Sequence, residues 1–423
     1  MRPLVVTLLC MLAAACGPRG HEAAPAGTPP AGAAAPAGAS AGAAAAFEQN
    51  LEQQLLNARP GSVIEIPVGT HPLERALAVR ANGVTLRGAG AERSILSFSK
   101  APAGTAGIVV SGNAFTIENL GISDSKGDAL AVNGGENIAV RAVHAAFSGG
   151  PQGGNGAFGI HVQGARNVLI EDCAVYSASG AGVYVAQSLN VIVRRCDVEQ
   201  DTVGIALANT VGADLQDGVA TGNSAGIVVF NSADVTPAGR AVRIFRNRLF
   251  KNNLGNFAAA GSALAGVPAG CGVLVNASSE VEIFDNDISD NQTANVMIAT
   301  YFMARAPALA GGAAAAPAYP QSIQIYGNRF VGGGYAPSVA ELKGVLQGKL
   351  APAARLPDVV WDGYRAERQA GQPAASPRIC VTNGSAAVLD ADAPHGFSHP
   401  ASGVKPFRCT LRKLAAVSLP AAP

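Results

Sequence analysis

His161 and Tyr184 are the two residues of this sequence whose types and spacing point most directly to chemistry. They hold the same position in two matching segments, GIHVQGARNVLIEDC and GVYVAQSLNVIVRRC, and lie 23 residues apart. Apolar residues flank each of them, an alternation typical of a β-strand that points every second side chain outward. If the two segments form adjacent strands, the imidazole and the phenol stand about 5 Å apart. They could then act as acid and base in a proton transfer.

The same two residues also have a plain structural interpretation, as half-exposed side chains that stack on a strand surface. The equivalent positions in neighbouring segments carry small or aliphatic residues: Val109, Ala131, Ala206 and Val228. Two functional groups therefore stand in a row of apolar ones. The sequence leaves both interpretations open.

Proton abstraction would need further groups around this pair. Removal of the C5 proton of a uronic acid requires a base, an acid for the leaving oxygen, and a cation or donors that neutralise the carboxylate. The nearest candidates for the cation are Arg141, Arg194 and Arg195. We predict His161 and Tyr184 as the catalytic pair, with no metal and no cofactor. The predicted substrate-binding residues are Lys126, Asp128, Asn155, Arg194 and Asp201.

The elements that would position these residues follow a repeat of 22 or 23 residues. Each repeat begins with a small residue, continues with alternating apolar residues, and carries Asn or a substitute in the turn that follows. A fixed period of this length indicates a solenoid of stacked units. Short β-branched runs bounded by Gly and Asn indicate that the units are built from strands. The repeats begin at Gly107, Ala129, Gly159, Gly182, Gly204, Gly226 and Gly272.

Two intervals in this series are longer, at 30 and 46 residues. The first contains the Gly-rich segment 148–158 and predicts an extra loop. We interpret the second as two coils with an insertion, NNLGNFAAAGSALAGVPAGCG. Insertions in solenoids tend to fall on one face, often the binding face. Ala304–Pro320 is predicted to be a surface loop, and Gln321–Phe330 to be the last coil.

The chain resembles known proteins in several segments. FEQNLEQQLLNA, VIEIPVGTH and VTLRGAG resemble the opening of right-handed parallel β-helix proteins of the pectin-lyase-like class. PQGGNGAFGIHVQGARNVLIEDC, NSAGIVVF and NDISDNQTANVMI resemble a family of bacterial parallel β-helix lipoproteins of unassigned activity. The resemblance implies a fold and a location rather than a reaction. The Asp-Pro-His signature of alginate epimerases and calcium-binding nonapeptide repeats are both absent from the sequence.

We therefore predict an all-β fold, a single-stranded right-handed parallel β-helix with 22–23 residues per coil. It should span residues 47–335 and begin with a cap helix at Phe47, because an open solenoid end needs a cover. Residues 336–423 are predicted to form an irregular C-terminal cap and tail, in which VAELKGVLQGKL looks helical and Trp361 could close the end.

The N-terminal residues 1–16 carry one Arg, a short apolar run and three Ala residues before Cys16. The apolar run is shorter than the roughly 20 residues that span a bilayer as a helix, so a cleaved signal is indicated. The Ala residues resemble a bacterial lipobox, which implies a lipid on Cys16. The alternative is an ordinary secretory signal with an incidental cysteine. Residues 17–46, nearly all Ala, Gly and Pro, should form a disordered tether.

Two pairs of cysteines are predicted to lie close together. Cys173 and Cys196 hold equivalent positions in adjacent coils, and we interpret them as a buried thiol stack, with a disulfide as the alternative. Cys380 and Cys409 are candidate disulfide partners in an oxidising compartment. The turn asparagines that we expect to hydrogen-bond along the stack are Asn167, Asn190, Asn247, Asn286 and Asn328.

Composition limits the classes of binding partner that we expect. The formal net charge is +1, from 30 basic and 29 acidic residues, so no general attraction to nucleic acid is expected. His395 and His399 have the spacing of a zinc pair on a helix, but the flanking Gly and Pro do not favour that helix.

Taken together, the sequence predicts an exported protein, lipid-anchored to the cell envelope at the outer membrane or facing the periplasm. It would bind or process an extended polysaccharide, with lyase or epimerase chemistry on uronic acids as the specific version. The alternative is a non-catalytic structural or assembly lipoprotein that engages a protein partner. Contact with the membrane would be through the N-terminal lipid only. The oligomeric state is left open.

Overall fold

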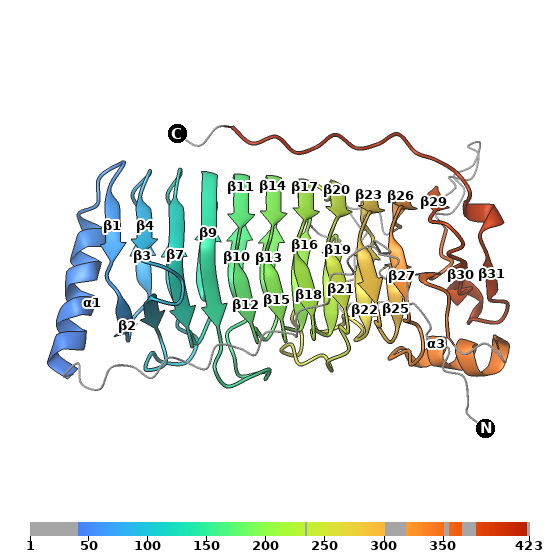
Figure 1. The fold of residues 1–423 in the computed structure, drawn as a ribbon, viewed down its shortest axis with the longest axis horizontal. Helices are drawn as coiled ribbons and strands as arrows, with labels where there is room; N and C mark the ends of the chain where they lie inside the picture. Colours follow the sequence, from blue (N-terminus) through green and yellow to red (C-terminus); the bar gives the residue numbers. More distant parts are fainter. Residues whose placement is uncertain (1–40, 233–234, 301–318, 351–354, 366–377, 421–423) are drawn as a thin grey trace, which may run out of the picture. The chain divides into compact units, whose positions relative to one another are not determined.

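The computed structural model describes residues 41–232, 235–300, 319–350, 355–365 and 378–420. Within these residues the chain winds into coils whose strands stack in two long sheets, so the predicted parallel β-helix is confirmed (Figure 1). In the described part of the chain, no helix is both long enough and apolar enough to cross a membrane. Residues 1–16 and Cys16 lie outside the described residues.

Each coil contributes one strand to the twelve-stranded sheet, which we call sheet B. Its strands pair in parallel, except that β31 runs antiparallel to β30. In order along the sheet the strands are β3 (Leu77–Val79), β6 (Ile108–Val110), β8 (Leu130–Asn133), β10 (Phe158–Gln163), β13 (Ala181–Ala186), β16 (Val203–Ala208), β19 (Ala225–Phe230), β22 (Cys271–Asn276), β25 (Ala294–Ala299), β28 (Val359–Trp361), β30 (Val388–Asp390) and β31 (Ala401–Gly403).

The nineteen-stranded sheet, which we call sheet A, receives the rest of each coil. In the central coils a residue with positive φ, such as Asp172 at φ 55°, divides this part into two strands. The strands before this division are β1 (Val63–Ile66), β4 (Thr85–Gly88), β7 (Thr116–Ser123), β9 (Glu136–Ala146), β11 (Arg166–Glu171), β14 (Leu189–Arg194), β17 (Val211–Gln216), β20 (Arg240–Phe245), β23 (Ser279–Phe284), β26 (Gln321–Tyr326) and β29 (Ile379–Thr382). Strands β7 and β9 run through the division, and the strands after it are β2 (Gly69–Pro72), β5 (Ser94–Ser97), β12 (Ala174–Tyr176), β15 (Asp197–Glu199), β18 (Val219–Thr221), β21 (Arg248–Phe250), β24 (Asp287–Ser289) and β27 (Arg329–Val331).

Rows of aliphatic side chains fill the interior of the solenoid. One such row, Val162, Val185, Leu207 and Val229, is at most 2% exposed. The small residue that opens each repeat is needed because successive coils approach closely. A Cβ atom on Gly182 would lie 2.9 Å from the carbonyl oxygen of the next coil. The small residue at the start of each repeat is therefore required by the stacking of the coils, and not only by strand propensity.

A helix covers the N-terminal end of the stack. Helix α1 (Ala41–Leu56) buries Leu51 and Leu55 against the first coil, and Phe47 stacks on His71 with ring centroids 4.1 Å apart. The helix starts before the predicted Phe47, so residues 41–46 belong to it rather than to the tether. Ala is the best helix former, which explains why an Ala-rich segment extends the helix.

The C-terminal boundary of the solenoid differs from the prediction. Strand β28 pairs with β25 in sheet B and β29 pairs with β26 in sheet A. Residues 321–330 are therefore not the last coil. Helix α3 (Ala340–Gly344) and the π-helical turn η2 (Val345–Lys349) pack on the outward face of sheet B instead of closing the end.

Two single-turn helices lie near the end of the stack, η3 (Ala393–His395) and η4 (Lys405–Phe407). Trp361 lies inside the solenoid, 6.1 Å from the ring of Phe407. The aromatic residue predicted to close the end is thus part of the core, and Phe407 packs against it.

The interval of 46 residues is one coil, and the interpretation as two coils was wrong. Ala225 pairs directly with Cys271 across β19 and β22. Strands β20 and β21 are that coil's contribution to sheet A, and residues 251–270 are an insertion before sheet B resumes. A count of residues cannot separate an extra coil from a long loop. Most of the third irregular stretch, Ala304–Pro320, lies outside the described residues.

Buried asparagines form ladders at two turns of the coil. In the first, the backbone amides of Asn247, Asn286 and Asn328 each donate to the side-chain oxygen of the Asn one coil further on, ending at Asn383. In the second, which the sequence analysis missed, Asn223 and Asn252 do the same toward Asn291. Asn167 and Asn190 belong to a third, more exposed ladder between side chains. The expectation of hydrogen bonds along the stack is confirmed.

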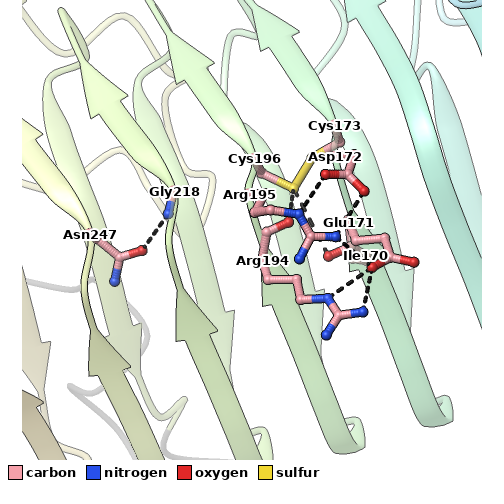
Figure 2. The surroundings of a disulfide bond; sticks show 9 residues. All are labelled: Ile170, Glu171, Asp172, Cys173, Arg194, Arg195, Cys196, Gly218 and Asn247. Carbon is pink, nitrogen blue, oxygen red and sulfur yellow. Dashed lines mark hydrogen bonds and ion pairs between the residues drawn. A yellow bond between two sulfur atoms is a disulfide. The ribbon is translucent and has the colours of Figure 1, made fainter.

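A disulfide takes the place of asparagine earlier in the first ladder. Cys173 and Cys196 are bonded, with Cα atoms 4.5 Å apart (Figure 2). The sulfur of Cys196 lies near the carbonyl oxygens of Ile170 and Arg194. At the same turn further along the stack, the side-chain amide nitrogen of Asn247 donates to the equivalent carbonyl oxygens, those of Leu215 and Phe245. The preferred interpretation of Cys173 and Cys196 as a thiol stack is replaced by a disulfide, because stacking brings equivalent Cα atoms within bonding range.

Candidate active site

His161 and Tyr184 are direct neighbours on the outward side of sheet B. They pair in register across β10 and β13, and their ring centroids lie 5.3 Å apart with the planes at 81°. Both side chains are partly buried, and only 15% of the His161 side chain is exposed. The repeat period placed this pair, because residues one coil apart must face each other.

Asp128 orients the imidazole from the preceding coil. Its Oδ2 atom lies 2.7 Å from Nδ1 of His161. A carboxylate can only accept a hydrogen bond, so Nδ1 carries a proton, and in the neutral imidazole Nε2 presents its lone pair. Nε2 is buried and has no hydrogen-bond partner among the described residues. This arrangement is the usual way to prepare a histidine as a base.

Tyr184 is suited to the opposite role. Burial raises the pKa of Tyr184 to about 12, so the phenol keeps its proton near neutral pH. A protonated phenol can donate but cannot serve as a base. The pair thus offers a prospective base, the imidazole that Asp128 orients, beside a neutral phenol that can donate a proton.

Phe158 closes the pair from the side of the first insertion. Its ring stacks on Tyr184 at 4.3 Å and meets His161 edge-on at 4.7 Å. Phe158 ends the Gly-rich segment 148–158, which Asn155 ties to the next coil by donating to the carbonyl oxygens of Gly150 and Ser177. Asn155 thus holds the loop in place. Phe158 was missed in the sequence, although it lies only three residues before His161 in AFGIH.

The outward face of sheet B changes character at this site. Ala78 is exposed and Val109 is partly exposed on the earlier coils, whereas Ala131, directly beside His161, is buried. From Tyr184 onward the face is covered by Leu264 and Val267 of the second insertion and by the helical turns that contain Leu342 and Val345. The two insertions also meet, since a Cβ on Gly153 would lie 3.1 Å from the carbonyl oxygen of Phe257. The pair therefore stands where an open sheet face ends at a wall.

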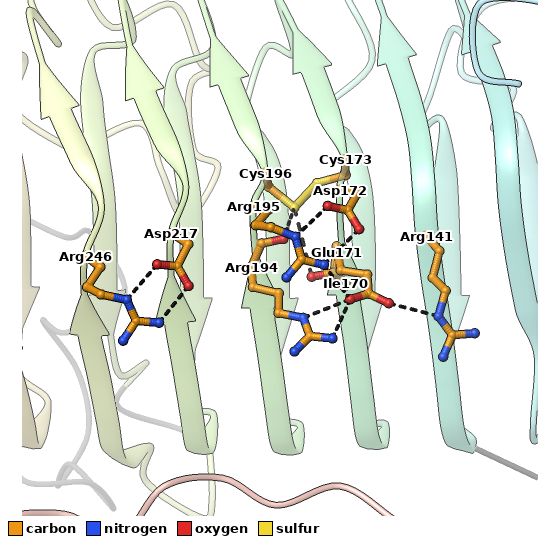
Figure 3. A network of polar contacts seen from close by, with 10 residues as sticks. All are labelled: Arg141, Ile170, Glu171, Asp172, Cys173, Arg194, Arg195, Cys196, Asp217 and Arg246. Carbon is orange, nitrogen blue, oxygen red and sulfur yellow. Dashed lines mark hydrogen bonds and ion pairs between the residues drawn. A yellow bond between two sulfur atoms is a disulfide. The ribbon is translucent and has the colours of Figure 1, made fainter. Parts of the chain in front are cut away.

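The predicted cations do not belong to this site. Arg141, Arg194 and Arg195 lie in or beside sheet A and surround Glu171 (Figure 3). Arg194 Nη2 lies 2.6 Å from Glu171 Oε2, and Arg141 Nε lies 3.0 Å from Glu171 Oε1. Burial alone would raise the pKa of Glu171, but the guanidinium hydrogen bonds hold it below its ordinary value. Nearness along the chain was misleading because each coil carries its residues onto different faces.

Asp201 is likewise not a substrate-binding residue. Its side chain is 0% exposed and forms the first rung of the second asparagine ladder. Oδ1 accepts the amide of Ala178 at 2.6 Å, and the amide of Asp201 donates to Asn223 at 2.8 Å. Oδ2 has no hydrogen-bond partner within the described part of the chain, and burial raises the pKa of Asp201 well above its ordinary value.

Of the remaining predicted residues, Lys126 is exposed two residues before Asp128. Cys380 and Cys409 are bonded to each other. Cys271 is buried, and burial raises its pKa to about 12, which leaves the thiol unreactive. No group of three or more metal-ligating side chains gathers anywhere in the described ranges.

Comparisons with known proteins agree with this architecture. The family model for the right-handed β-helix region matches residues 82–242. None of the curated proteins matches the sequence at a significant level. Two similar solved structures are A-modules of mannuronan C-5 epimerases from Azotobacter vinelandii.

The A-module of AlgE6 has a TM-score of 0.55 and 15% identity, and the match covers 81% of this chain and 89% of that one. The A-module of AlgE4 has a TM-score of 0.52 and 15% identity, over 69% and 85%. At this identity the likeness concerns the fold alone. The fold of the chain is a right-handed parallel β-helix.

Proposed function

We propose that this protein acts on an extended, uronate-containing polysaccharide by proton transfer at His161 and Tyr184. The observation that carries the proposal is the hydrogen bond of 2.7 Å between Asp128 and His161, which leaves an unpartnered Nε2 beside a protonated phenol. Similar structures that are mannuronan C-5 epimerases support the substrate class. The open coils of sheet B before His161 offer a flat surface for a polymer.

In this proposal His161 Nε2 removes the C5 proton of a uronate residue, and Asp128 stabilises the resulting imidazolium. Tyr184 then either donates a proton to C5 from the other side, which gives an epimer, or protonates the leaving oxygen, which gives an unsaturated sugar. Lys126 is the exposed cation nearest to Asp128 in the chain and is our candidate for neutralising the uronate carboxylate. Phe158 must move for a sugar to reach Nε2, and the glycines of segment 148–158 allow that movement.

Exchange with deuterated water tests the chemistry without assuming the product. The full chain is incubated with polyuronates and other envelope polysaccharides, and loss of C5 protons is followed by NMR while unsaturated ends are followed by absorbance. We expect exchange or elimination that His161→Ala abolishes and that Asp128→Asn and Tyr184→Phe reduce by about 100-fold or more. Arg194→Gln is the matched control on sheet A and should leave activity unchanged. If no polysaccharide exchanges, eliminates or binds, the proposal is wrong.

The second candidate is a non-catalytic envelope lipoprotein. The observation that favours it is the closed state of the pair, in which Phe158 and Tyr184 pack around an imidazole nitrogen without solvent contact. In this case the three aromatic side chains stabilise the fold. His161→Ala and Tyr184→Phe would then lower the melting temperature without removing any activity.

Export and lipid anchoring at Cys16 form part of the same proposal. Support comes from the disulfides Cys173–Cys196 and Cys380–Cys409, which are typical of oxidising compartments. Cys16→Ser should abolish partitioning of the protein into membranes. Unchanged partitioning would contradict the lipid anchor.

A further inference from the structure

The C-terminal tail, residues 410–420, lies along the outward face of sheet A, where Figure 1 draws it as an extended trace above the strands. It starts at Cys409, which the disulfide fixes to Cys380 on β29. Cys380 is the last member of an outward row across neighbouring strands. The row consists of Asp214, Arg243, Glu282, Gln324 and Cys380. The tail follows this row back toward the N-terminal coils.

The sheet holds the tail by its backbone. The amide of Leu411 donates to Gln324 Oε1 at 2.9 Å. The amide of Leu414 donates to Glu282 Oε1 at 3.1 Å, and that of Val417 donates to Asp214 Oδ2 at 3.2 Å. The residues that donate are three apart.

Burial of the tail follows the same interval. Leu411, Leu414 and Val417 are partly buried, whereas the two residues between each of them are exposed. A repeat of three is typical of an extended polyproline II segment, which rises about 3.1 Å per residue. Three residues then cover about two strand spacings of 4.8 Å. Glu282 and Asp214 are two strands apart, so the tail and the sheet match in period between Leu414 and Val417, whereas Gln324 and Glu282 lie on adjacent strands.

Charge complements this geometry. Asp214 is 4% exposed and Glu282 is 3% exposed, and burial raises the pKa of both, although the amide donors and Arg243 oppose it. The tail contributes the basic pair Arg412 and Lys413, and Lys413 Nζ lies 5.3 Å from the ring centroid of Tyr326. Two of the three acceptors in the sheet are therefore acidic and face a segment of chain with a basic pair.

The groove extends beyond the described tail. A pocket of about 640 Å³ continues from Leu419 and Pro420 toward the first coils. Its lining includes Thr85, Thr116, Arg87 and Glu118. The surface that accommodates the tail is thus longer than the described part of the tail, which ends at Pro420.

We propose that this groove is a binding site for an extended, basic polypeptide, and that the C-terminal tail is its intramolecular ligand. A partner chain would present amide donors at three-residue intervals, small or aliphatic residues between the sheet and its backbone, and a basic pair. The tail holds the site through its high effective concentration, so a partner enters when the tail is displaced. The proposal does not depend on any chemistry at His161.

The test uses the full chain with Leu414→Pro and Val417→Pro. Proline removes two of the three amide donors while keeping the backbone angles of an extended segment; this is the donor-less variant, in which only the Leu411 amide remains. The control, Ala415→Pro with Ser418→Pro, removes two amides at exposed positions and keeps the donors. A fluorescent peptide with the sequence TLRKLAAVSLP is then titrated into each protein. We expect the donor-less variant to bind it about tenfold more tightly than the control or the wild type.

Two further measurements make the test specific. In the donor-less protein, Glu282→Gln should weaken peptide binding by about tenfold, whereas Asp217→Asn, an acid of sheet A outside the row, should not. A peptide N-methylated at the positions of Leu411, Leu414 and Val417 should not bind. A peptide N-methylated at the positions of Arg412, Ala415 and Ser418 should bind normally.

Trypsin cleavage after Arg412 reports whether the tail is released, because Leu414→Pro blocks cleavage after Lys413. Faster cleavage in the donor-less variant together with peptide binding supports the proposal. Faster cleavage without peptide binding would mean that the tail is only a structural strap, and unchanged cleavage would mean that the amide contacts do not hold it. Either result overturns the proposal, as does equal binding of the two methylated peptides or binding of a polysaccharide in place of the peptide.

Discussion

The early and late coils of sheet A place different chemistry at the same repeat positions. One outward row reads Glu65, Arg87, Glu118, Arg141, Glu171, Arg194, Gln216, Phe245, Phe284 and Tyr326. The early members alternate in charge and form ion pairs such as Arg87 with Glu65. The late members stack as parallel rings, 4.8 and 5.0 Å between centroids.

The turn that follows this row in the chain also differs between the early and the late coils. The disulfide Cys173–Cys196 occupies it in the early coils, and the ladder from Asn247 to Asn383 occupies it in the late coils. A coil stack needs attraction between equivalent residues at about 4.8 Å. Alternating charge, stacked rings, amide ladders and a covalent bond all satisfy this need. The difference is that a ladder extends over any number of coils, whereas a disulfide ties only two.

Breaking the asparagine ladder should have the largest effect. Asn286→Ala removes the acceptor for Asn247 and the donor to Asn328 and Ile244, all of them buried. Because these groups find no water, we expect the free energy of unfolding to fall by about 3 kcal/mol or more. Asn190→Ala, in the more exposed ladder, is the control and should cost less than about 1 kcal/mol. Equal losses in thermal unfolding would contradict the distinction.

Removing the disulfide tests whether an asparagine can replace it at this turn. Cys173→Ala with Cys196→Ala should lower the free energy of unfolding by about 3 kcal/mol. Cys173→Ala with Cys196→Asn should recover part of this loss, because the new amide can donate to Ile170 and Arg194, where the sulfur now lies. Chemical denaturation of the oxidised proteins measures both. If the asparagine variant is no more stable than the alanine variant, the turns are not equivalent.

Asp201 marks a place where the second ladder is incomplete. At equivalent positions Asn223 and Asn252 donate to carbonyl oxygens, whereas Asp201 Oδ2 finds no partner among the residues that the structure describes. Asp201→Asn should therefore stabilise the protein by about 1 to 2 kcal/mol, and Asn223→Asp should destabilise it.

The same substitution has a pH signature. Because the pKa of Asp201 is raised in the fold, the wild type keeps its stability at low pH and loses it as the pH rises through that value. The advantage of Asp201→Asn should thus grow with pH. A constant advantage across the pH range would contradict the buried acid.

Loss of a charge from the outward row that contains Glu171 should have the smallest effect on stability. Its pH dependence should be opposite to that of Asp201. Glu171→Gln leaves three guanidinium groups without their shared acceptor, and we expect a loss of about 1 kcal/mol that shrinks in high salt. The lowered pKa of Glu171 means that its contribution is present above the ordinary carboxyl pKa and disappears as the pH falls. Phe284→Leu is the control, since ring stacking does not respond to salt. A salt-independent loss for Glu171→Gln would rule out the electrostatic account.

The fold and the central pair could be predicted because the period leaves little freedom. Once one coil takes 23 residues, His161 must lie beside Tyr184, and Cys173 beside Cys196, whatever else the chain does. The same rule failed at the interval between Gly226 and Gly272, where an insertion imitates an extra coil. It also failed for Asp201. This acid opens the ladder that continues through Asn223 and Asn252, and that ladder was not recognised in the sequence.

The rest of the site and the tail depend on contacts that no period encodes. Arg194 faces away from His161 because the turn between β13 and β14 carries the chain from sheet B to sheet A. The three-residue pattern of Leu411, Leu414 and Val417 was present in the sequence, but it has meaning only against the acceptors of sheet A.

By itself the sequence determined which residues are neighbours one coil apart, because strand stacking converts a regular spacing into contact. It thereby placed His161 beside Tyr184. Only the tertiary structure decided which face each row occupies, which acid orients the histidine, and where the tail binds. Those relations join segments such as Asp214 and Val417 across the fold, and they follow from the geometry of turns, insertions and packing rather than from any repeat.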